Sequence, residues 1–183
     1  TWAGIRSDGT LWTFAGITGT DGRQGDGTTI TRLSPVQVGT SSWTAVASSA
    51  QLTAVYAIRS DNTLWSWGGN LYGGLGANSS LAADRRSSPV QIGSSTWAAI
   101  SVAGQSTIAK RSDGVLFGWG RNAAGEIGDG TTIPRSSPVQ IGASSWVAVA
   151  NTYKSTMAYR NDGTLWVWGQ SITGELGLNN TTN

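Results

Sequence analysis

The chain has 183 residues, a formal net charge of +2, only 12% charged residues, and neither cysteine nor histidine. This composition excludes disulfides and thiol chemistry, and it removes the usual base of hydrolase triads and the commonest zinc ligand. No apolar stretch reaches the about 18 residues that a membrane-spanning helix needs. No basic run exceeds two residues. We therefore expect no membrane span and no nucleic-acid interface.

One short segment occurs four times along the chain. Asp8-Gly9-Thr10-Leu11-Trp12 returns at residues 61–65, 113–117 and 162–166, at periods of 53, 52 and 49 residues. A Gly-x-x-Gly follows each copy, and three copies continue with Ser-Pro-Val-Gln and then Trp at nearly constant offsets. Such self-similarity indicates one supersecondary unit that stacks on copies of itself. Residues that recur are expected to build the repeat, so off-pattern residues become the candidates for function.

Within each copy, the elements follow in a fixed order. A strand (53–59, 107–111 and 156–160) leads into the turn, and Asp-Gly between alternating apolar and polar runs predicts a tight hairpin. The Thr-Leu-Trp-x-Trp-Gly run after the turn is the next strand. Ser-Pro-Val-Gln is a further strand, with its proline expected at the first position, where no ladder N–H is lost. Another strand begins at Trp43, Trp97 and Trp146.

The pattern therefore predicts an all-β fold of propeller blades, each with four antiparallel strands, in about 3.5 repeats of roughly 49–53 residues. We expect residues 1–183 to form a single repeat domain, with its turns at Asp8, Asp61, Asp113 and Asp162. The sequence opens partway through a strand and stops before the next proline would fall. We expect both ends to be truncated within a repeat, as in part of a larger or oligomeric propeller.

The third copy reads Asp-Gly-Val-Leu-Phe-Gly-Trp-Gly-Arg-Asn at residues 113–122 and continues with Gly-Glu-Ile-Gly at residues 125–128. This pattern resembles the repeat of the regulator-of-chromosome-condensation family, in a bacterial or viral surface-type variant. The resemblance implies a β-propeller and a role such as exchange factor, enzyme inhibitor or surface module. Family repeats commonly open the strand before the turn with His-Thr. Here those places hold Leu or Ser before Thr, so hydroxyls are expected to make the blade-to-blade hydrogen bond: Leu52-Thr53, Ser106-Thr107 and Ser155-Thr156.

The charged residues mostly follow the repeat. Of ten acidic residues, only Asp21 and Asp84 are off-pattern, and they lie in different repeats, so no paired carboxylates for catalysis are indicated. The carboxylates are also too sparse for a calcium loop. Arginines recur two residues before each turn aspartate, which indicates cross-strand contacts rather than a phosphate track. We expect no enzyme activity and no catalytic, cofactor or metal site.

The loops that depart from the repeat length are where a binding surface is expected. The second repeat has a three-residue expansion within residues 77–88, and the first has two extra residues around 17–21. Tyr72 is an aromatic residue in a turn that elsewhere holds Arg, Ala or Thr. The candidate interaction residues are Ile17, Asp21, Tyr72, Leu81, Asp84, Arg85 and Arg86.

Three functions remain open at this point. Low charge and absent cysteine favour a non-catalytic structural or adhesive module of an exterior assembly, such as a virion fibre, tail or decoration protein, or a secreted filament. That places the protein outside the cell, on a cell surface or on a virion, with other chains or further copies as partners, or a surface glycan or receptor. The second hypothesis is a soluble protein-binding propeller resembling an inhibitor or exchange factor. The third is a carbohydrate-binding module, although nine of the ten tryptophans occupy repeated positions.

Overall fold

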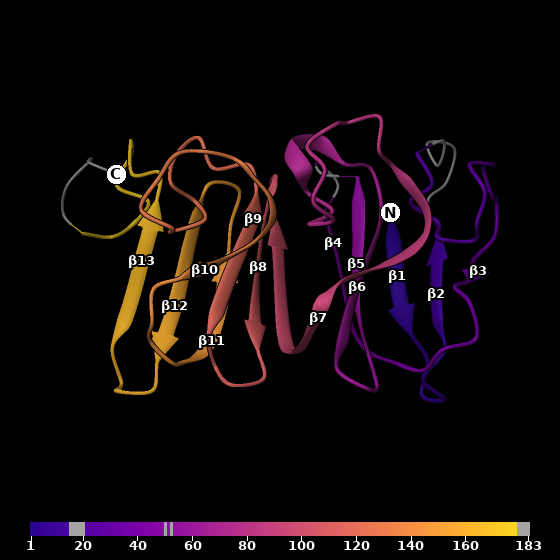
Figure 1. Ribbon diagram of the computed structural model, residues 1–183, viewed down its shortest axis with the longest axis horizontal. Coiled ribbons are helices and arrows are strands. Elements are labelled where there is room, and N and C mark those ends of the chain that lie inside the picture. The colour runs from indigo at the N-terminus through magenta and orange to yellow at the C-terminus, as the bar shows by residue number, and fades with distance from the viewer. Residues whose placement is uncertain (15–20, 50, 52, 179–183) are drawn as a thin grey trace.

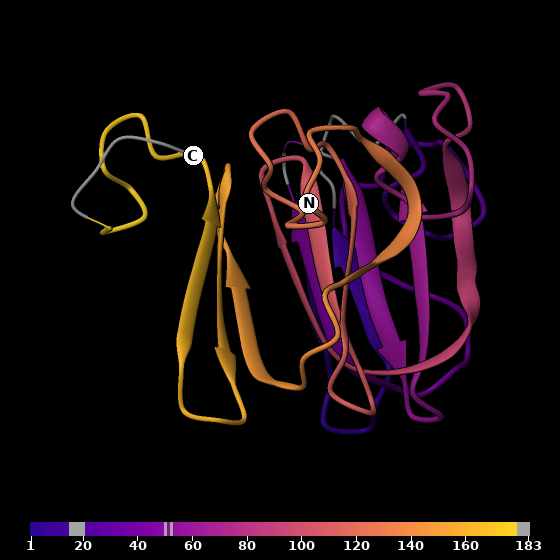
Figure 2. The same ribbon diagram turned by 60° about the vertical axis from the view of Figure 1, so that its left-hand side comes forward.

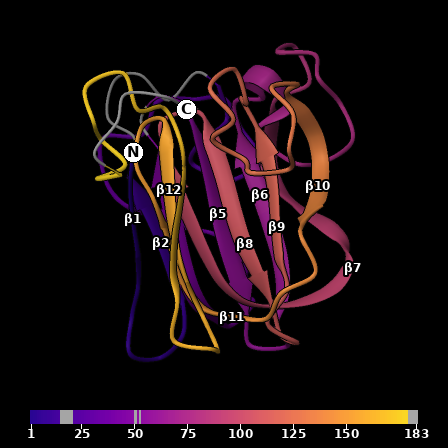
Figure 3. The same cartoon turned by 90° about the vertical axis from the view of Figure 1, so that its left-hand side faces the viewer.

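The computed structural model describes residues 1–14, 21–49, 51 and 53–178. Within these residues the fold is all-β, as predicted: the strands pair antiparallel, and a single turn of 3₁₀ helix, η2 (Leu71–Gly73), interrupts them. The strands divide into four blades that stand face to face in chain order (Figures 1 and 3).

Each blade is a small twisted sheet. The first contains β1 (Trp2–Ile5), β2 (Leu11–Phe14) and β3 (Val36–Gln37). The second contains β4 (Trp43–Ser49), β5 (Ala54–Arg59), β6 (Thr63–Gly68) and the first part of β7 (Arg86–Ala103). The third contains the second part of β7, β8 (Ser106–Arg111), β9 (Leu116–Gly120) and β10 (Arg135–Ile141). The fourth contains β11 (Trp146–Asn151), β12 (Ser155–Arg160) and β13 (Leu165–Gly169).

The long strand β7 joins the two central blades. Its first part pairs with β6, for example Arg86 opposite Gly68, and its second part pairs with β8, with Trp97 opposite Arg111. The chain thus leaves one blade as its outermost strand and enters the next as that blade's first strand. The second and third blades each have the four antiparallel strands that the sequence predicts.

The two ends of the blades carry different connections. The tight Asp-Gly hairpins lie at one end of the strands, which we call the turn face, at the bottom of Figure 1. The longer loops that follow β6 and β9, together with η2, lie at the opposite end, which we call the loop face (Figures 1 and 2). The expanded loop of the second repeat therefore belongs to the loop face.

The position predicted for the strand prolines is wrong in two repeats. β7 and β10 begin three residues before Pro89 and Pro138, so each proline lies inside its strand. Both sit where the register shifts, between Arg86 and Val90 and between Arg135 and Val139. A bulge on the outermost strand accommodates a residue that lacks an N–H, because the ladder is already interrupted there.

The apolar core lies between blades rather than inside any one of them. One cluster joins Tyr56 and Leu64 of the second blade to Trp97 and Trp119 of the third. Tyr56 meets Trp119 edge to face across the two blades, with ring centroids 6.2 Å apart. Two further clusters join the first blade to the second and the third blade to the fourth in the same way. Since each buried aromatic removes about 150–250 Å² from water, neighbouring blades stabilise one another.

Candidate interaction site

The Gly-x-x-Gly segments of the first three repeats each dock onto the following blade. The indole N–H of Trp119 donates to the Gly74 carbonyl oxygen at 2.8 Å, and Trp67 and Trp168 bond the equivalent carbonyls of Arg23 and Glu126 at 3.1 Å each. A Cβ on Gly76, the second glycine of its segment, would lie 2.8 Å from the Trp119 indole nitrogen. The glycine is therefore required because the neighbouring ring occupies the space of a side chain.

Hydroxyl groups complete this contact, as expected from the missing imidazoles. The Thr156 hydroxyl donates to the Glu126 carbonyl oxygen at 2.8 Å. Thr107 instead donates to the Tyr56 hydroxyl at 3.1 Å, and Tyr56 donates in turn to the Gly74 carbonyl oxygen. Burial raises the pKa of Tyr56, which keeps its phenol protonated as the donor that this chain requires.

Two buried asparagines shape the loops of the second and third repeats. The Asn122 side-chain oxygen accepts from the Ile127 N–H at 3.0 Å, and its amide donates to the carbonyl oxygens of Thr131 and Ile133 at 3.0 and 3.2 Å. Asn70 binds the carbonyl oxygens of Ser79 and Leu81 in the same way. Leu81 thus occupies the place of Ile133 in the repeat, and its side chain is 64% exposed.

The second repeat lacks the loop aspartate of its neighbours, and an aspartate of the expanded loop takes over its hydrogen bond. In the first and third repeats a loop aspartate accepts from a threonine hydroxyl at 2.8 Å and from an arginine, as Asp129 does from Thr131 and Arg135. The second repeat has alanine at that position, and Asp84 from the expansion accepts from the Ser79 hydroxyl instead. Arg86, the equivalent of Arg135, has no ion pair among the described residues and is exposed.

The turn face is built from recurring groups. Asp8, Asp61 and Asp162 each accept from the backbone N–H and hydroxyl of the threonine two residues later, and these hydrogen bonds hold their pKa values below the ordinary one. The threonine hydroxyl then accepts from an indole N–H. The third repeat has Val115 and Phe117 in place of the threonine and the tryptophan, so it lacks the hydroxyl and indole hydrogen bonds. Its Arg111 lies 2.6 Å from the turn aspartate, whereas the equivalent pairs of the first and fourth repeats are 4.0 and 3.8 Å apart.

The arginines before the turns stack on aromatic rings of the neighbouring strands. The Arg59 guanidinium carbon lies 3.7 Å from the Trp65 ring centroid, and that of Arg160 lies 4.7 Å from the Trp166 centroid. Such cation–π contacts account for these arginines within the blades. This agrees with the cross-strand role expected from their register.

A hollow on the loop face brings together residues from the two loops of irregular length. It has a volume of about 310 Å³ and is lined by Asp21, Gln51, Thr53, Gly69, Asn70, Leu71, Ala82 and Arg85. Two of the candidate residues, Asp21 and Arg85, therefore share one hollow although they come from different repeats. Tyr72 adjoins it, 42% exposed, with a φ of +55°.

The carboxylate in this hollow is already engaged. The Arg23 side chain donates to both Asp21 oxygens, one of them at 2.7 Å from the Arg23 Nε. Burial acts to raise the pKa of Asp21, but the hydrogen bonds and positive charge of Arg23 outweigh it, and the pKa is lowered overall. Leu81, Asp84 and Arg86 lie in the same expanded loop but do not line the hollow. Ile17 falls outside the described residues.

The sequence interpretation missed two residues here. Leu71 is exposed beside Tyr72 and lines the hollow. Gln24 is fully buried, and neither its amide oxygen nor its nitrogen has a hydrogen-bond partner in the part of the chain that is described. The signal for Gln24 was available, because the other repeats have Leu75, Ile127 and Leu176 at that position of the Gly-x-x-Gly segment.

Among the described residues, no group of three or more acidic side chains is placed to hold a metal ion. No helix in the same part of the chain is long and apolar enough to span a membrane.

Together, the antiparallel blades and their docking segments define part of a β-propeller. Residues 113–159 match the model of the Regulator of chromosome condensation (RCC1) repeat, which confirms the resemblance seen in the third copy. No curated protein matches the sequence.

Solved propellers share the fold over nearly the whole chain. A structure of Prp20p from Saccharomyces cerevisiae, studied for its binding to Gsp1p and histones, is 19% identical with a TM-score of 0.83, over 99% of this chain and 46% of that one. A structure of Kap60 bound to yeast RCC1 (Prp20) matches at 19% identity and a TM-score of 0.81, over 99% and 44%. Human WBSCR16 matches at 17% identity and a TM-score of 0.80, over 99% and 47%. The chain therefore spans less than half of the length of these structures.

Proposed function

We propose that this chain is a non-catalytic, protein-binding propeller module that contacts its partner through the loop face. The observation that carries the proposal is that repeated polar residues and off-pattern residues lie in different surroundings. Recurring carboxylates and hydroxyls are bound within the repeats, whereas Asp21 and Arg85, two residues that break the repeat, line one hollow on the loop face, beside the exposed Tyr72. Repeated residues build the scaffold, and the irregular loops supply the contact surface.

The exposed residues in and beside the expanded loop of the loop face are of the types that bind protein partners. Tyr72, Leu71 and Leu81 offer exposed apolar area, and Arg86 has lost the carboxylate that binds its equivalents in the other repeats. Aromatic and arginine side chains beside aliphatic ones are typical of protein interfaces, where such residues contribute most of the binding energy. The relatives lend support at the level of class, because the Prp20 structures include a complex with Kap60 and a study of binding to Gsp1p and histones.

We further propose that the module works in an exterior assembly, on a cell surface, a virion or a secreted filament. The support is compositional: charged residues make up 12% of the chain, and cysteine is absent. Electron microscopy of the native source material, with the protein labelled by antibody, tests this location. Label on filaments, particles or the cell surface agrees with the proposal, and label confined to the cell interior contradicts it.

Site-specific photo-crosslinking tests the binding face. A photo-reactive residue at Tyr72 on the loop face is compared with one at Ser112, an exposed residue beside the third Asp-Gly turn on the turn face. We expect one discrete protein adduct from position 72 that is absent from position 112. The substitution Leu81→Asp should abolish that adduct without lowering the melting temperature. Equal adducts from both faces would refute a dedicated loop-face site.

A further inference from the structure

One repeated residue of the loops is apolar but does not enter the core. Ile30, Leu81 and Ile133, which we call the aliphatic row, lie in the loops that follow β2, β6 and β9, and their side chains are 58–64% exposed. Among the described residues, none of them joins or packs against an interblade core cluster. A single exposed aliphatic residue is ordinary on a protein surface. The same exposed residue type in three successive repeats indicates a shared role.

The same hydrogen bonds hold each member of the aliphatic row. Its backbone N–H donates at 3.3 Å to the hydroxyl of the residue two positions earlier, and that hydroxyl donates to a loop carboxylate. The hydroxyl and carboxylate pairs are Thr28 with Asp26, Ser79 with Asp84 and Thr131 with Asp129. These bonds fix the loop backbone, so the loops lose little conformational entropy when a partner binds.

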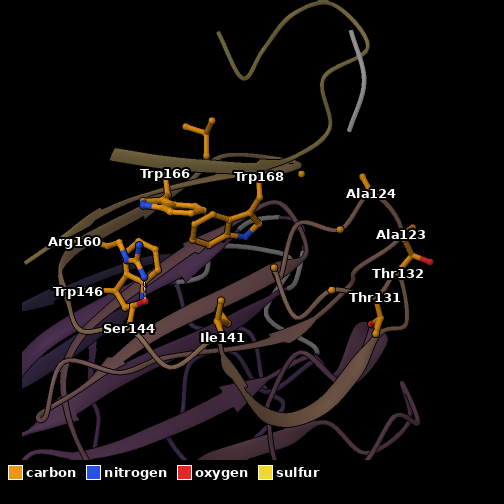
Figure 4. A pocket seen from close by; sticks show the side chains of 16 residues that line it. Ala123, Ala124, Thr131, Thr132, Ile141, Ser144, Trp146, Arg160, Trp166 and Trp168 are labelled. Carbon is orange, nitrogen blue, oxygen red and sulfur yellow. Dashed lines mark hydrogen bonds between the residues drawn. The ribbon is translucent and has the colours of Figure 1, made fainter. Parts of the chain in front are cut away.

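Buried asparagines fix two of these loops further. The Asn122 amide donates to the Ile133 carbonyl oxygen at 3.2 Å, and the Asn70 amide donates to that of Leu81 at 3.1 Å. Figure 4 shows how the loop of the third repeat folds back, so that its two threonines lie near Ala123 at its start. The exposed aliphatic side chains are therefore presented on closed, hydrogen-bonded loops.

The second repeat keeps the aliphatic residue although its loop sequence differs. Thr-Thr-Ile occurs at residues 28–30 and again at 131–133, and copying of the repeat alone would account for both. The second repeat has three extra residues and an alanine at the place of the loop aspartate. Ser79 and Asp84 nevertheless rebuild the hydrogen bonds, and Leu81 occupies the same place. A different loop thus presents the same kind of side chain, which copying does not explain.

Contacts between blades arrange the three residues in a row. The N–H groups of Gly27 and Asn78 donate to the carbonyl oxygens of Ser87 and Ser136, both at 2.8 Å. These bonds join each loop to the outermost strand of the next blade, and that strand begins where the next loop of the row ends. The blades stand face to face in chain order (Figure 1). Facing sheets pack about 10 Å apart, so the row is roughly 20 Å long.

Arginines supply the charge that is exposed beside the aliphatic row. Arg32 and Arg135 bind Asp26 and Asp129 at 2.9 and 2.6 Å, and the aspartate side chains are buried whereas the arginine side chains are partly exposed. Arg86, their equivalent in the second blade, is exposed and has no ion pair among the described residues. The surface along the row therefore combines aliphatic with positive groups, which complements a partner with aliphatic and acidic side chains.

The apolar surface of the row is narrow. The residue before each of its members is polar and exposed: Thr29, Ser80 and Thr132. A line of single aliphatic side chains between hydroxyl groups suits one peptide segment better than a lipid surface, which requires a broader apolar face.

We propose that the aliphatic row is a docking surface for a segment of a partner protein that combines aliphatic with acidic residues. The aliphatic side chains of that segment pack on Ile30, Leu81 and Ile133, and a carboxylate pairs with Arg86. An extended segment needs about six or more residues to cover the row, at about 3.3 Å per residue. The inference rests on the proposed loop-face function, because it names the part of that face and the type of segment that bind.

The test measures the fluorescence anisotropy of a labelled, capped dodecapeptide of alternating leucine and glutamate while the 183-residue protein is added. We expect saturable binding, and at least about tenfold weaker binding of the same peptide with lysine in place of glutamate. Ile30→Ser and Ile133→Ser should each weaken binding of both peptides at least about fivefold, because an apolar contact is lost. Arg86→Gln should instead lower the preference for glutamate over lysine.

Ile172→Ser is the matched control. Ile172 is 63% exposed and lies on the loop that follows β13, outside the aliphatic row. Its substitution should leave the peptide affinity unchanged, and all the isoleucine variants should keep the parent melting temperature because the side chains are exposed.

The proposal is overturned if the glutamate peptide shows no saturable binding, or if Ile30→Ser and Ile133→Ser bind it as tightly as the parent protein does. A dimer that these variants dissociate, or binding to phosphatidylcholine vesicles that they abolish, would also overturn it, because a second copy or a lipid surface would then occupy the row. A photo-adduct at position 72 together with unchanged peptide affinity in the row variants would overturn this inference alone and leave the loop-face proposal standing.

Discussion

Gly76 offers a test of how the blades are held together. It is the second glycine of its Gly-x-x-Gly segment, with a φ of +68°, and its Cα faces the indole of Trp119 in the next blade. Substitution Gly76→Ala adds a methyl group 2.8 Å from the Trp119 indole nitrogen. The ring cannot move away freely, because it is fully buried and its N–H binds Gly74.

Two costs add at this position. A side chain at positive φ costs about 1–2 kcal/mol. Forcing a methyl group into a packed interface costs about 1–3 kcal/mol more. We therefore expect Gly76→Ala to lower the free energy of unfolding by about 2–5 kcal/mol, measured by urea denaturation with tryptophan fluorescence.

Gly177→Ala separates the two costs. Gly177 is the equivalent glycine of the last repeat, with a φ of +67° and nothing within 4 Å of a Cβ. Its substitution should cost only the backbone part, about 1–2 kcal/mol. Equal losses in the two variants would refute the reasoning, because the cost would then lie in the turn itself and not in the contact between blades.

Three further predictions concern buried polar groups. Tyr56→Phe should lower the free energy of unfolding by about 1–3 kcal/mol in urea, because the Thr107 hydroxyl loses its acceptor. Gln24→Leu should raise the melting temperature in calorimetry, because a buried amide with no described partner is replaced by the residue type of the other repeats. Hydrogen bonds from threonine and arginine outweigh burial and lower the pKa values of Asp26 and Asp129, so their stabilising contribution is present above about pH 4. It should be lost as the pH falls through the lowered values, seen as a declining melting temperature.

Controls for these predictions come from the same chain. Tyr159→Phe removes a hydroxyl from an exposed tyrosine and should change the free energy of unfolding by less than about 0.5 kcal/mol. A loss equal to that of Tyr56→Phe would contradict the interblade role of the Tyr56 hydroxyl. A lower melting temperature for Gln24→Leu would show that the Gln24 amide has a partner. In Asp129→Asn the acid-dependent decline should be smaller, and an unchanged decline would contradict the assignment.

Much of the fold could be predicted from the sequence because repetition multiplies a weak local signal. A single Asp-Gly turn suggests one hairpin, but four copies at nearly constant spacing indicate a stack of blades. The Pro89 and Pro138 positions were missed because a bulge on an outer strand leaves no mark in the local sequence. The structural equivalence of Leu81 and Ile133 could not be predicted either. It rests on buried hydrogen bonds from Asn70 and Asn122 to their carbonyl oxygens.

The candidate site was less predictable, for a physical reason. Sequence comparison between repeats identifies residues that differ, but it cannot show which of them meet. Asp21 and Arg85 are far apart in the chain and share a hollow only because consecutive blades place their loops side by side. Asp84 differs from the repeat in sequence, yet it performs the structural task of the missing loop aspartate.

The most direct test of the central claim compares partner affinity between the two faces. Once the adduct at position 72 identifies the partner, its dissociation constant is measured by calorimetry for Tyr72→Ala on the loop face and for Asn161→Ala beside the last turn. We predict at least about tenfold weaker binding for Tyr72→Ala and no change for Asn161→Ala, with equal melting temperatures. Unchanged affinity in Tyr72→Ala, or an equal loss in both variants, would contradict a loop-face binding module.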